Sequence, residues 1–376
     1  MQKLIVLALT LSCFSINSLS STKEIDVAYT FFFEDKFNES TTDIKNGIDL
    51  AMEIFNKNNK TGLRLNLKKY PYNKSLNSSI LVSKKIKEDG HRFVIGGEYS
   101  SEAIIFSRKL GERVFITPTA SNPSVTKNSK HAFRACLSDE TKVNKLAKFV
   151  ARHLKPKSVG IVHNISTPYT DYLSKQFYKV FLRTSPNTKL LVRKVTRRNY
   201  DYKKIVSDFM ANNVDHVIPL SYSSDMRRFL AEAKNSNFHP VYIGGDGWGS
   251  NSYVKRTFVD EAKQYAVKFI GYRINYWAGE LDRKPLLNFK SRFRKKFNEE
   301  ANAWNAIGFD TANLLFQAIE KSYPDTSVET VRRNLLSTKT NQLVTTESLS
   351  FEEDGSPDKD LHIYKITKDG VNYVRW

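Results

Sequence analysis

The chain has 376 residues, of which 59 are Lys or Arg and 39 are Asp or Glu, so its formal net charge is +20. Hydrophobic residues make up 40% and charged residues 26%, a globular composition that excludes disordered, collagen-like, coiled-coil and small disulfide-rich chains. The length predicts about two or three domains. The cationic residues are spread along the whole chain with no zinc-finger or aromatic-interleaved motif, so we expect no nucleic-acid partner.

The N-terminus has the features of a secretory signal peptide over residues 1–20. Lys3 supplies a positive charge, residues 4–11 are apolar, and small residues precede a cut after residue 20. The apolar run is far shorter than the roughly 20 residues that span a bilayer. We therefore expect export. Lipid attachment at Cys13 is the alternative, and a cut after residue 20 leaves Cys136 as the only thiol, expected to be a buried small residue.

Short apolar strands then alternate with helices of amphipathic spacing. Strands are expected at 25–29, 63–67, 93–95 and 114–116, with helices at 44–55, 77–89 and 101–110. The pattern restarts with helices at 142–153, 170–182, 202–211 and 225–233 and strands at 159–162, 189–192, 216–219 and 241–243. Repeats of this length predict an α/β fold with two doubly wound parallel sheets.

The last third of the chain is expected to complete these two lobes. A strand is predicted at 268–272, helices at 285–297 and 305–322, and a β-rich end over 348–376 with turns at Asp-Gly pairs. Ligands of doubly wound sheets bind beyond the carboxyl ends of the strands, so the loops that follow the strands are the candidate site.

Four of these loops carry residues suited to ligand binding. Residues 96–101 (GGEYSS) place Ser100 at a helix N-terminus, where an anion is favoured, although a plain helix cap would look the same. Residues 117–123 (TPTASNP) form a rigid polar loop, and Tyr169 follows another strand. Residues 244–249 (GGDGWG) hold Asp246 at a strand end, where its carboxylate could receive an ammonium group.

These loops carry a family resemblance that extends over nearly the whole mature chain. The sequence resembles the type I periplasmic solute-binding proteins, in particular the leucine/isoleucine/valine-binding group of ABC transporters. Four segments are similar to that family's motifs: TPTASNPSVT (117–126), IGGDGWGS (243–250), GFDTANLL (308–315) and FEEDGSPDKDLHIYKI (351–366). The resemblance implies a periplasmic protein with two lobes, three crossovers and a ligand cleft between them.

The resemblance also implies residue roles. Ser100 falls where the family binds a ligand α-carboxylate, and Ser121 where a hydroxyl bridges that carboxylate and the ammonium. Thr119 falls where a main-chain carbonyl receives the ammonium, and Asp246 on the acidic partner of the same ammonium. The aromatic positions of the second lobe fall on Tyr169 and Tyr222. A side-chain pocket is expected around Phe31–Phe33 and the loop to Phe37.

From these features we expect an exported monomer that captures a small zwitterion, an amino acid, and delivers it to a membrane ABC permease, with no cofactor or metal. Lobe one is expected over 23–138 and 266–345, and lobe two over 139–265 and 346–376. Three alternatives stay open: a periplasmic sensor for a kinase or chemoreceptor, with an amide or other small ligand, a secreted receptor ectodomain, and an enzyme. No H-E-x-x-H or G-x-S-x-G motif points to an enzyme, and His163 is expected to be packed at a strand end.

Overall fold

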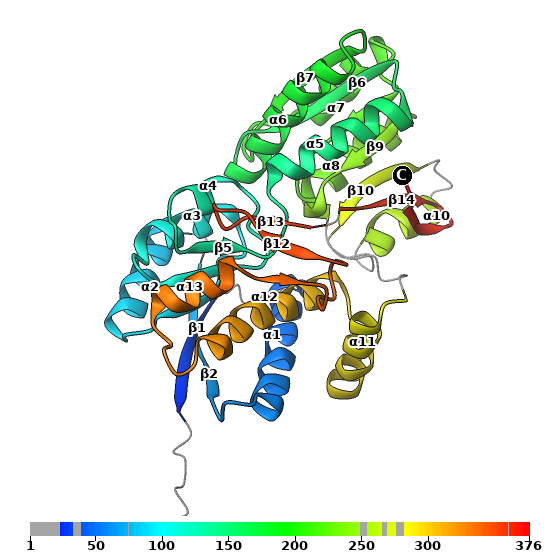
Figure 1. Cartoon of the computed structure of the whole chain (residues 1–376). Helices are drawn as coiled ribbons and strands as arrows, with labels where there is room; N and C mark the ends of the chain where they lie inside the picture. The colour runs from blue at the N-terminus through cyan, green and yellow to red at the C-terminus, as the bar shows by residue number, and fades with distance from the viewer. Residues whose placement is uncertain are drawn as a thin grey trace, which may run out of the picture.

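The structure is a computed structural model of the whole chain that describes residues 23–32, 39–73, 75–248, 254–264, 269–275, 282–359 and 361–376. The expected signal peptide with Cys13, and Phe33 and Phe37 of the expected side-chain pocket, lie outside the described residues. Figure 1 shows two lobes, one built around the blue strands of the N-terminal region and the other around the green strands of the middle of the chain.

Lobe one contains a five-stranded parallel sheet in the order β2-β1-β3-β4-β5. Its strands are β1 (Glu24–Phe32), β2 (Arg64–Tyr72), β3 (Phe93–Gly96), β4 (Val114–Thr117) and β5 (Ala132–Arg134). Helices α1 (Glu39–Asn58), α12 (Ala303–Ser322) and α13 (Val328–Leu336) share one hydrophobic core with the sheet, and α2 (Leu76–Glu88) and α3 (Ser100–Lys109) share another. Both faces of the sheet are therefore covered, as the strand–helix alternation predicts.

Helices α1 and α12 come so close that glycine is required at their contact. A Cβ atom at Gly47 would lie 2.0 Å from the Asn305 backbone oxygen, and one at Gly308 would lie 2.2 Å from the Ile44 backbone oxygen. No real Cβ could occupy either position, because the two backbones touch directly. Helix α11 (Lys284–Phe297) packs beside them through Phe289 and Phe293.

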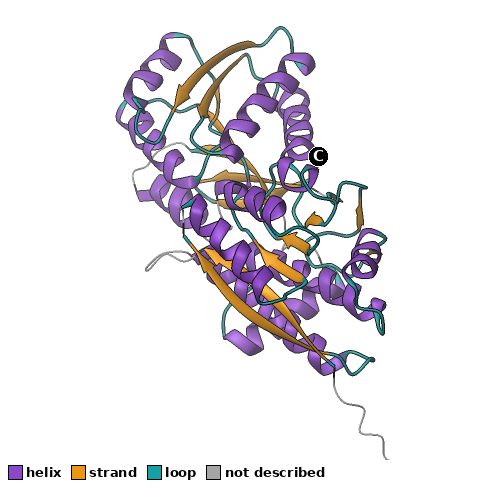
Figure 2. Cartoon of the chain, turned by 90° about the vertical axis from the view of Figure 1, so that its left-hand side faces the viewer, coloured by secondary structure: helices purple, strands orange, loops and turns teal. Residues whose placement is uncertain are grey.

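Lobe two contains a seven-stranded sheet in the order β15-β14-β10-β9-β8-β6-β7. Five strands are parallel: β6 (Ser158–Asn164), β7 (Lys189–Val195), β8 (His216–Ile218), β9 (Val241–Gly244) and β10 (Ile270–Asn275). The hairpin β14 (His362–Thr367) and β15 (Gly370–Val374) adds an antiparallel edge. Its longer helices are α5 (Asp139–Phe149), α6 (Pro168–Thr184), α7 (Tyr202–Ala211) and α8 (Ser223–Asn235), and Figure 2 shows helices and strands layered in both lobes.

The predicted lobe boundaries differ from the observed sheets in two places. Strand β10 was expected in lobe one, within 266–345, but it pairs with β9 and β14 in the sheet of lobe two. Residues 346–358 were expected in lobe two, but β12 (Leu349–Phe351) and β13 (Pro357–Asp358) join β11 (Lys339–Thr340) in a small sheet. This sheet lies against lobe one, because the ring of Phe351 is 5.4 Å from that of Phe133. The lobe to which a strand belongs depends on the strand it pairs with, and the sequence of a short apolar strand does not indicate its pairing partner.

The chain therefore passes between the lobes after β5, after β10 and after β13. The short helix α4 (Ser124–Lys127), β5 and α13 were not predicted, since each is short or lacks a long periodic pattern. Cys136, the free cysteine among the described residues, is buried at the first passage, and burial raises its pKa to about 11. Within the described ranges, every helix is too short or too polar to cross a membrane.

Candidate ligand-binding site at the contact of the two lobes

In lobe one, the loops after β3 and β4 are tied together by hydroxyl groups. Ser100, the first residue of α3, is buried, and its hydroxyl accepts a hydrogen bond from the Asn122 backbone N–H at 3.3 Å. The Thr119 hydroxyl donates to the Glu98 carbonyl at 2.7 Å, and the Thr117 hydroxyl donates to the Gly97 carbonyl at 2.7 Å. The two segments that the sequence singled out thus form one polar surface at the carboxyl ends of their strands.

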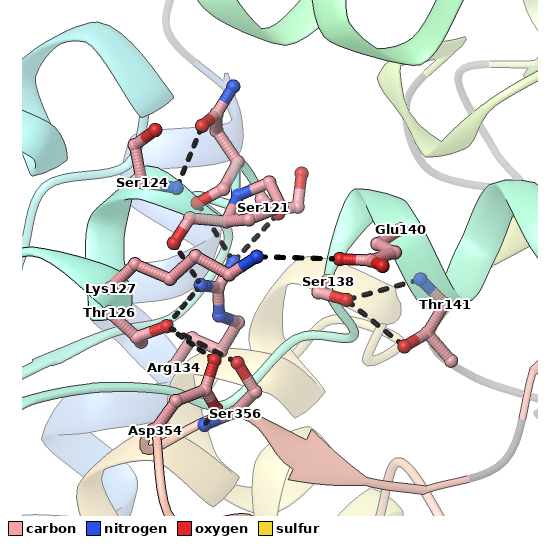
Figure 3. A network of polar contacts seen from close by, with 12 residues as sticks. Ser121, Ser124, Thr126, Lys127, Arg134, Ser138, Glu140, Thr141, Asp354 and Ser356 are labelled. Atoms are coloured by element: carbon pink, nitrogen blue, oxygen red, sulfur yellow. Dashed lines mark hydrogen bonds and ion pairs between the residues drawn. The ribbon is translucent and has the colours of Figure 1, made fainter. Parts of the chain in front are cut away.

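Arg134, the last residue of β5, donates hydrogen bonds to the loop that follows β4. Its side chain is fully buried, and its guanidinium donates to the carbonyls of Ser121 at 2.7 Å and Asn122 at 3.0 Å and to the Thr126 hydroxyl at 2.7 Å. Figure 3 shows this arginine reaching into the curve of the loop, with Asp354 beside Thr126. A planar fork of donors suits converging carbonyl oxygens, so Arg134 sets the position of Ser121.

Glu98 is a buried carboxyl behind the same surface. Its Oε2 accepts a hydrogen bond from the Thr41 hydroxyl at 2.6 Å, and its backbone N–H donates to the Tyr72 hydroxyl at 3.1 Å. Burial raises the pKa of Glu98 to about 8, against the lowering effect of the Thr41 and Tyr29 hydroxyls. This carboxyl is therefore mostly neutral at pH 7.

In lobe two, Asp246 lies in a short 3-10 turn (Asp246–Trp248) just after β9 and is buried. The Tyr169 hydroxyl, from the first turn of α6, donates to Asp246 Oδ1 at 2.6 Å and accepts from the Gly247 N–H at 3.1 Å. The Tyr222 ring stacks at a tilt against Tyr169, with 5.3 Å between the ring centroids. The three lobe-two residues predicted from the resemblance are thus brought together.

The other oxygen of Asp246 is bound by a lysine that the sequence reasoning did not single out. Lys142 Nζ lies 2.7 Å from Asp246 Oδ2 and 3.0 Å from Asp139 Oδ1, and 5.5 Å from the centroid of the Tyr169 ring. Its side chain is 1% exposed, against 4% for that of Asp246 and 0% for that of Asp139. The carboxylate of Asp246, which was expected to bind the ammonium group of a ligand, is therefore paired with the ammonium group of Lys142.

Charges of opposite sign stabilise one another inside this cluster. Burial alone would lower the pKa of Lys142, but the carboxylates of Asp246 and Asp139 outweigh it and hold that pKa above its usual value, so the lysine is charged. Burial raises the pKa of Asp139, and Lys142 and the Ser121 hydroxyl oppose the increase. Burial and the nearby Asp246 raise the pKa of Tyr169, so its hydroxyl stays protonated.

The two lobes touch at these residues. The Asn122 side-chain amide donates to the Pro168 carbonyl at 2.9 Å, and the rings of Tyr99 and Tyr222 meet edge to face at 6.3 Å. Near the surface, Lys127 lies 3.7 Å from Glu140, an ion pair visible in Figure 3. All six predicted site residues, Ser100, Thr119, Ser121, Tyr169, Tyr222 and Asp246, lie in the loops and helix starts that form this contact.

The other residues considered in the sequence analysis pack against the protein interior or at the edge of the site. Phe31 stacks on Tyr29 at 5.3 Å, while the buried ring of Phe32 meets Tyr99 at 5.4 Å and so reaches the edge of the site. His163 is buried at the end of β6 with its Nε2 2.8 Å from Asp171 Oδ1, which agrees with a packed histidine. Asp310 of the GFDTANLL segment accepts the backbone N–H groups of Val344 and Thr345 and therefore has a structural role.

Comparison with known proteins decides the family. The sequence pattern of the family described as "Periplasmic binding protein" matches residues 28–371. The chain belongs to this family. A Leu/Ile/Val-binding protein of Rhizobium johnstonii is 27% identical over 214 residues, which are 56% of this chain and 58% of that protein. The chain thus spans somewhat more than half the length of this relative.

Solved structures agree with the observed fold. A leucine-binding protein of Thermotoga maritima superposes with a TM-score of 0.82 at 17% identity, covering 93% of this chain and 98% of the other. A solute-binding protein of an ABC transporter from R. palustris, solved with benzoate, has a TM-score of 0.78 at 11% identity, covering 93% and 95%. The expected fold class, a type I periplasmic binding protein with parallel-sheet lobes, is therefore confirmed. Family members are solute-binding transport proteins.

Proposed function

We propose that this chain is an exported solute-binding protein that captures a small carboxylate-bearing molecule between its lobes and delivers it to a membrane ABC permease. The observation that carries the proposal is the meeting of polar groups from both lobes, with Ser100 and Ser121 on one side and Tyr169 on the other. Closure of two lobes on a ligand buries it and creates a surface that a membrane partner can distinguish from the open form.

The start of helix α3 supports a carboxylate at the lobe-one side. The first N–H groups of a helix have no acceptor within the helix, and the N-cap residue, Tyr99, supplies no side-chain cap. The helix dipole adds a partial positive charge at the same point, next to the Ser100 hydroxyl. An anionic oxygen would satisfy these donors.

The named ligands of similar proteins support the same class. The name of the Thermotoga maritima protein gives leucine as its ligand, and the R. palustris structure contains benzoate. Both molecules carry a carboxylate, whereas only leucine has an ammonium group. The carboxylate is thus the group that the two ligands share. The narrower expectation, an amino acid whose ammonium binds Asp246, stays a prediction.

A thermal-shift screen of amino acids, 2-oxo acids and aromatic carboxylates tests the proposal. A compound at 100 times its Kd should stabilise the protein by about 2.7 kcal/mol, a rise in Tm of about 3 °C for a chain of this size. Ser100→Ala should weaken binding at least tenfold. Ser107→Ala is the matched control, because Ser107 is buried on the same helix and, among the described residues, its hydroxyl donates to the Ile104 carbonyl one turn earlier at 3.0 Å. Equal losses in both variants, or no shift with any carboxylate, would overturn the proposal.

A further inference from the structure

We infer that the ligand of this chain is a carboxylate without an ammonium group, because Lys142 takes the place of that ammonium on Asp246. This inference rests on the proposed function and narrows it to one ligand class. The observations that carry it are the pairing of Asp246, the burial of the ion cluster and the position of its members within one lobe.

Asp246 already has a direct partner on each oxygen. Oδ2 binds Lys142 Nζ at 2.7 Å, and Oδ1 accepts the Tyr169 hydroxyl at 2.6 Å. A ligand ammonium could reach this carboxylate only by displacing one of them or by sitting beside the lysine. Displacement would leave a buried lysine with a weaker set of partners, and a position beside it would bring two like charges together in a site of low dielectric constant.

The second carboxylate of the cluster does not restore a cation site. Asp139 is the first residue of α5, where helix N–H groups and the helix dipole favour a negative charge. It also lies 3.0 Å from Lys142. Its side chain is 0% exposed, so a ligand cation does not reach it from the site.

The cluster belongs to lobe two and does not depend on closure. Lys142 and Asp139 come from α5, Tyr169 from α6 and Asp246 from the turn after β9. The Asp139 N–H also donates to the Ser121 carbonyl of lobe one at 2.8 Å, but Lys142, Tyr169 and Asp246 are all packed within lobe two, so the lysine stays on Asp246 when the lobes separate. The ion pair is a fixed part of the binding surface, and a ligand meets a carboxylate that is already paired with Lys142. The rings of Tyr169 and Tyr222 then offer an aromatic wall to an uncharged ligand body.

The ligand class that fits is a small 2-oxo acid or an alkyl or aryl carboxylate. Calorimetric titration with matched pairs tests this directly: leucine with 4-methyl-2-oxopentanoate, phenylalanine with phenylpyruvate, and alanine with pyruvate, with benzoate added. The members of each pair differ only in an ammonium or an oxo group. We expect at least one oxo acid, or benzoate, to bind wild-type protein, and the amino acid of a binding pair to bind at least tenfold more weakly.

Substitution of the lysine should move this preference. Lys142→Gln is one atom shorter, keeps a donor and removes the charge, so the ratio of amino-acid to oxo-acid affinity should rise at least tenfold. Lys148→Gln is the control, because it removes the same charge from an exposed position of the same helix, and its ratio should stay within twofold of wild type. The wild-type comparison stands even where Lys142→Gln fails to fold.

The outcomes separate the two proposals. An amino acid that binds wild type as tightly as its oxo acid, or more tightly, overturns this inference and leaves the proposed function intact. Failure of every amino acid, oxo acid and benzoate to bind overturns the proposed function, and this inference falls with it.

Discussion

Loss of the Lys142 ammonium should destabilise the whole protein, because it leaves two carboxylates buried without their cation. Removal of one partner from a buried ion pair costs about 3–5 kcal/mol. Lys142 is 1% exposed and contacts both Asp246 and Asp139, so Lys142→Met belongs in that range. Unfolding entropy of about 2.1 cal/mol/K per residue converts this to a Tm about 4–6 °C lower if the 376 residues unfold in one step.

Urea unfolding at pH 7, followed by circular dichroism, measures the effect. The double variant Lys142→Met with Asp246→Asn should recover part of the loss, with a coupling energy of about 1–3 kcal/mol, since Asn keeps an oxygen for the Tyr169 hydroxyl. Lys148→Met, at an exposed position of the same helix, should stay within about 0.5 kcal/mol of wild type. A loss below about 1 kcal/mol in Lys142→Met, or strictly additive effects in the double variant, would refute the reasoning.

Two further predictions concern lobe one. Since burial raises the pKa of Glu98 from an ordinary 4.5 to about 8, its contribution to stability is complete below about pH 4.5 and is lost as the pH rises through 8. Glu98→Gln should remove this loss. Between pH 5 and 9, the unfolding free energy of the variant should therefore rise relative to that of wild type by a few kcal/mol. Parallel pH curves for the two proteins would contradict the raised pKa of Glu98. Arg134→Met should leave the carbonyls of Ser121 and Asn122 without their donor and cost about 2–4 kcal/mol, with binding weakened at least tenfold. Unchanged binding in a folded Arg134→Met would show that the loop is held by other contacts.

The fold was largely readable from the sequence because its elements are locally encoded. Helix α7, over Tyr202–Ala211, was predicted with the observed bounds, since four buried apolar residues recur on one face. Lobe membership was less readable. Strand β10 and the segment of β12 were assigned to the wrong lobes, because pairing partners are chosen by tertiary packing and leave no local pattern.

At the site, the sequence indicated the loops but not their electrostatics. Asp246 and Tyr169 were named separately, yet nothing in their spacing showed that they would share a hydrogen bond. Lys142 begins a predicted helix, but the helical pattern alone assigns it no role at the site. One signal was available: it stands four residues before Leu146, a buried position of α5, so a charge on that face needed a partner. Arg134 gave a weaker signal, as a charged residue within an apolar segment.

A crystal structure of the wild-type protein with the carboxylate that stabilises it most would test the central claim directly. The account predicts the ligand between the lobes, with its carboxylate within about 3 Å of the Ser100 hydroxyl or the first N–H groups of α3, and with Lys142 still paired to Asp246. A ligand bound elsewhere on the protein, or a ligand ammonium on Asp246 with Lys142 displaced, would contradict it.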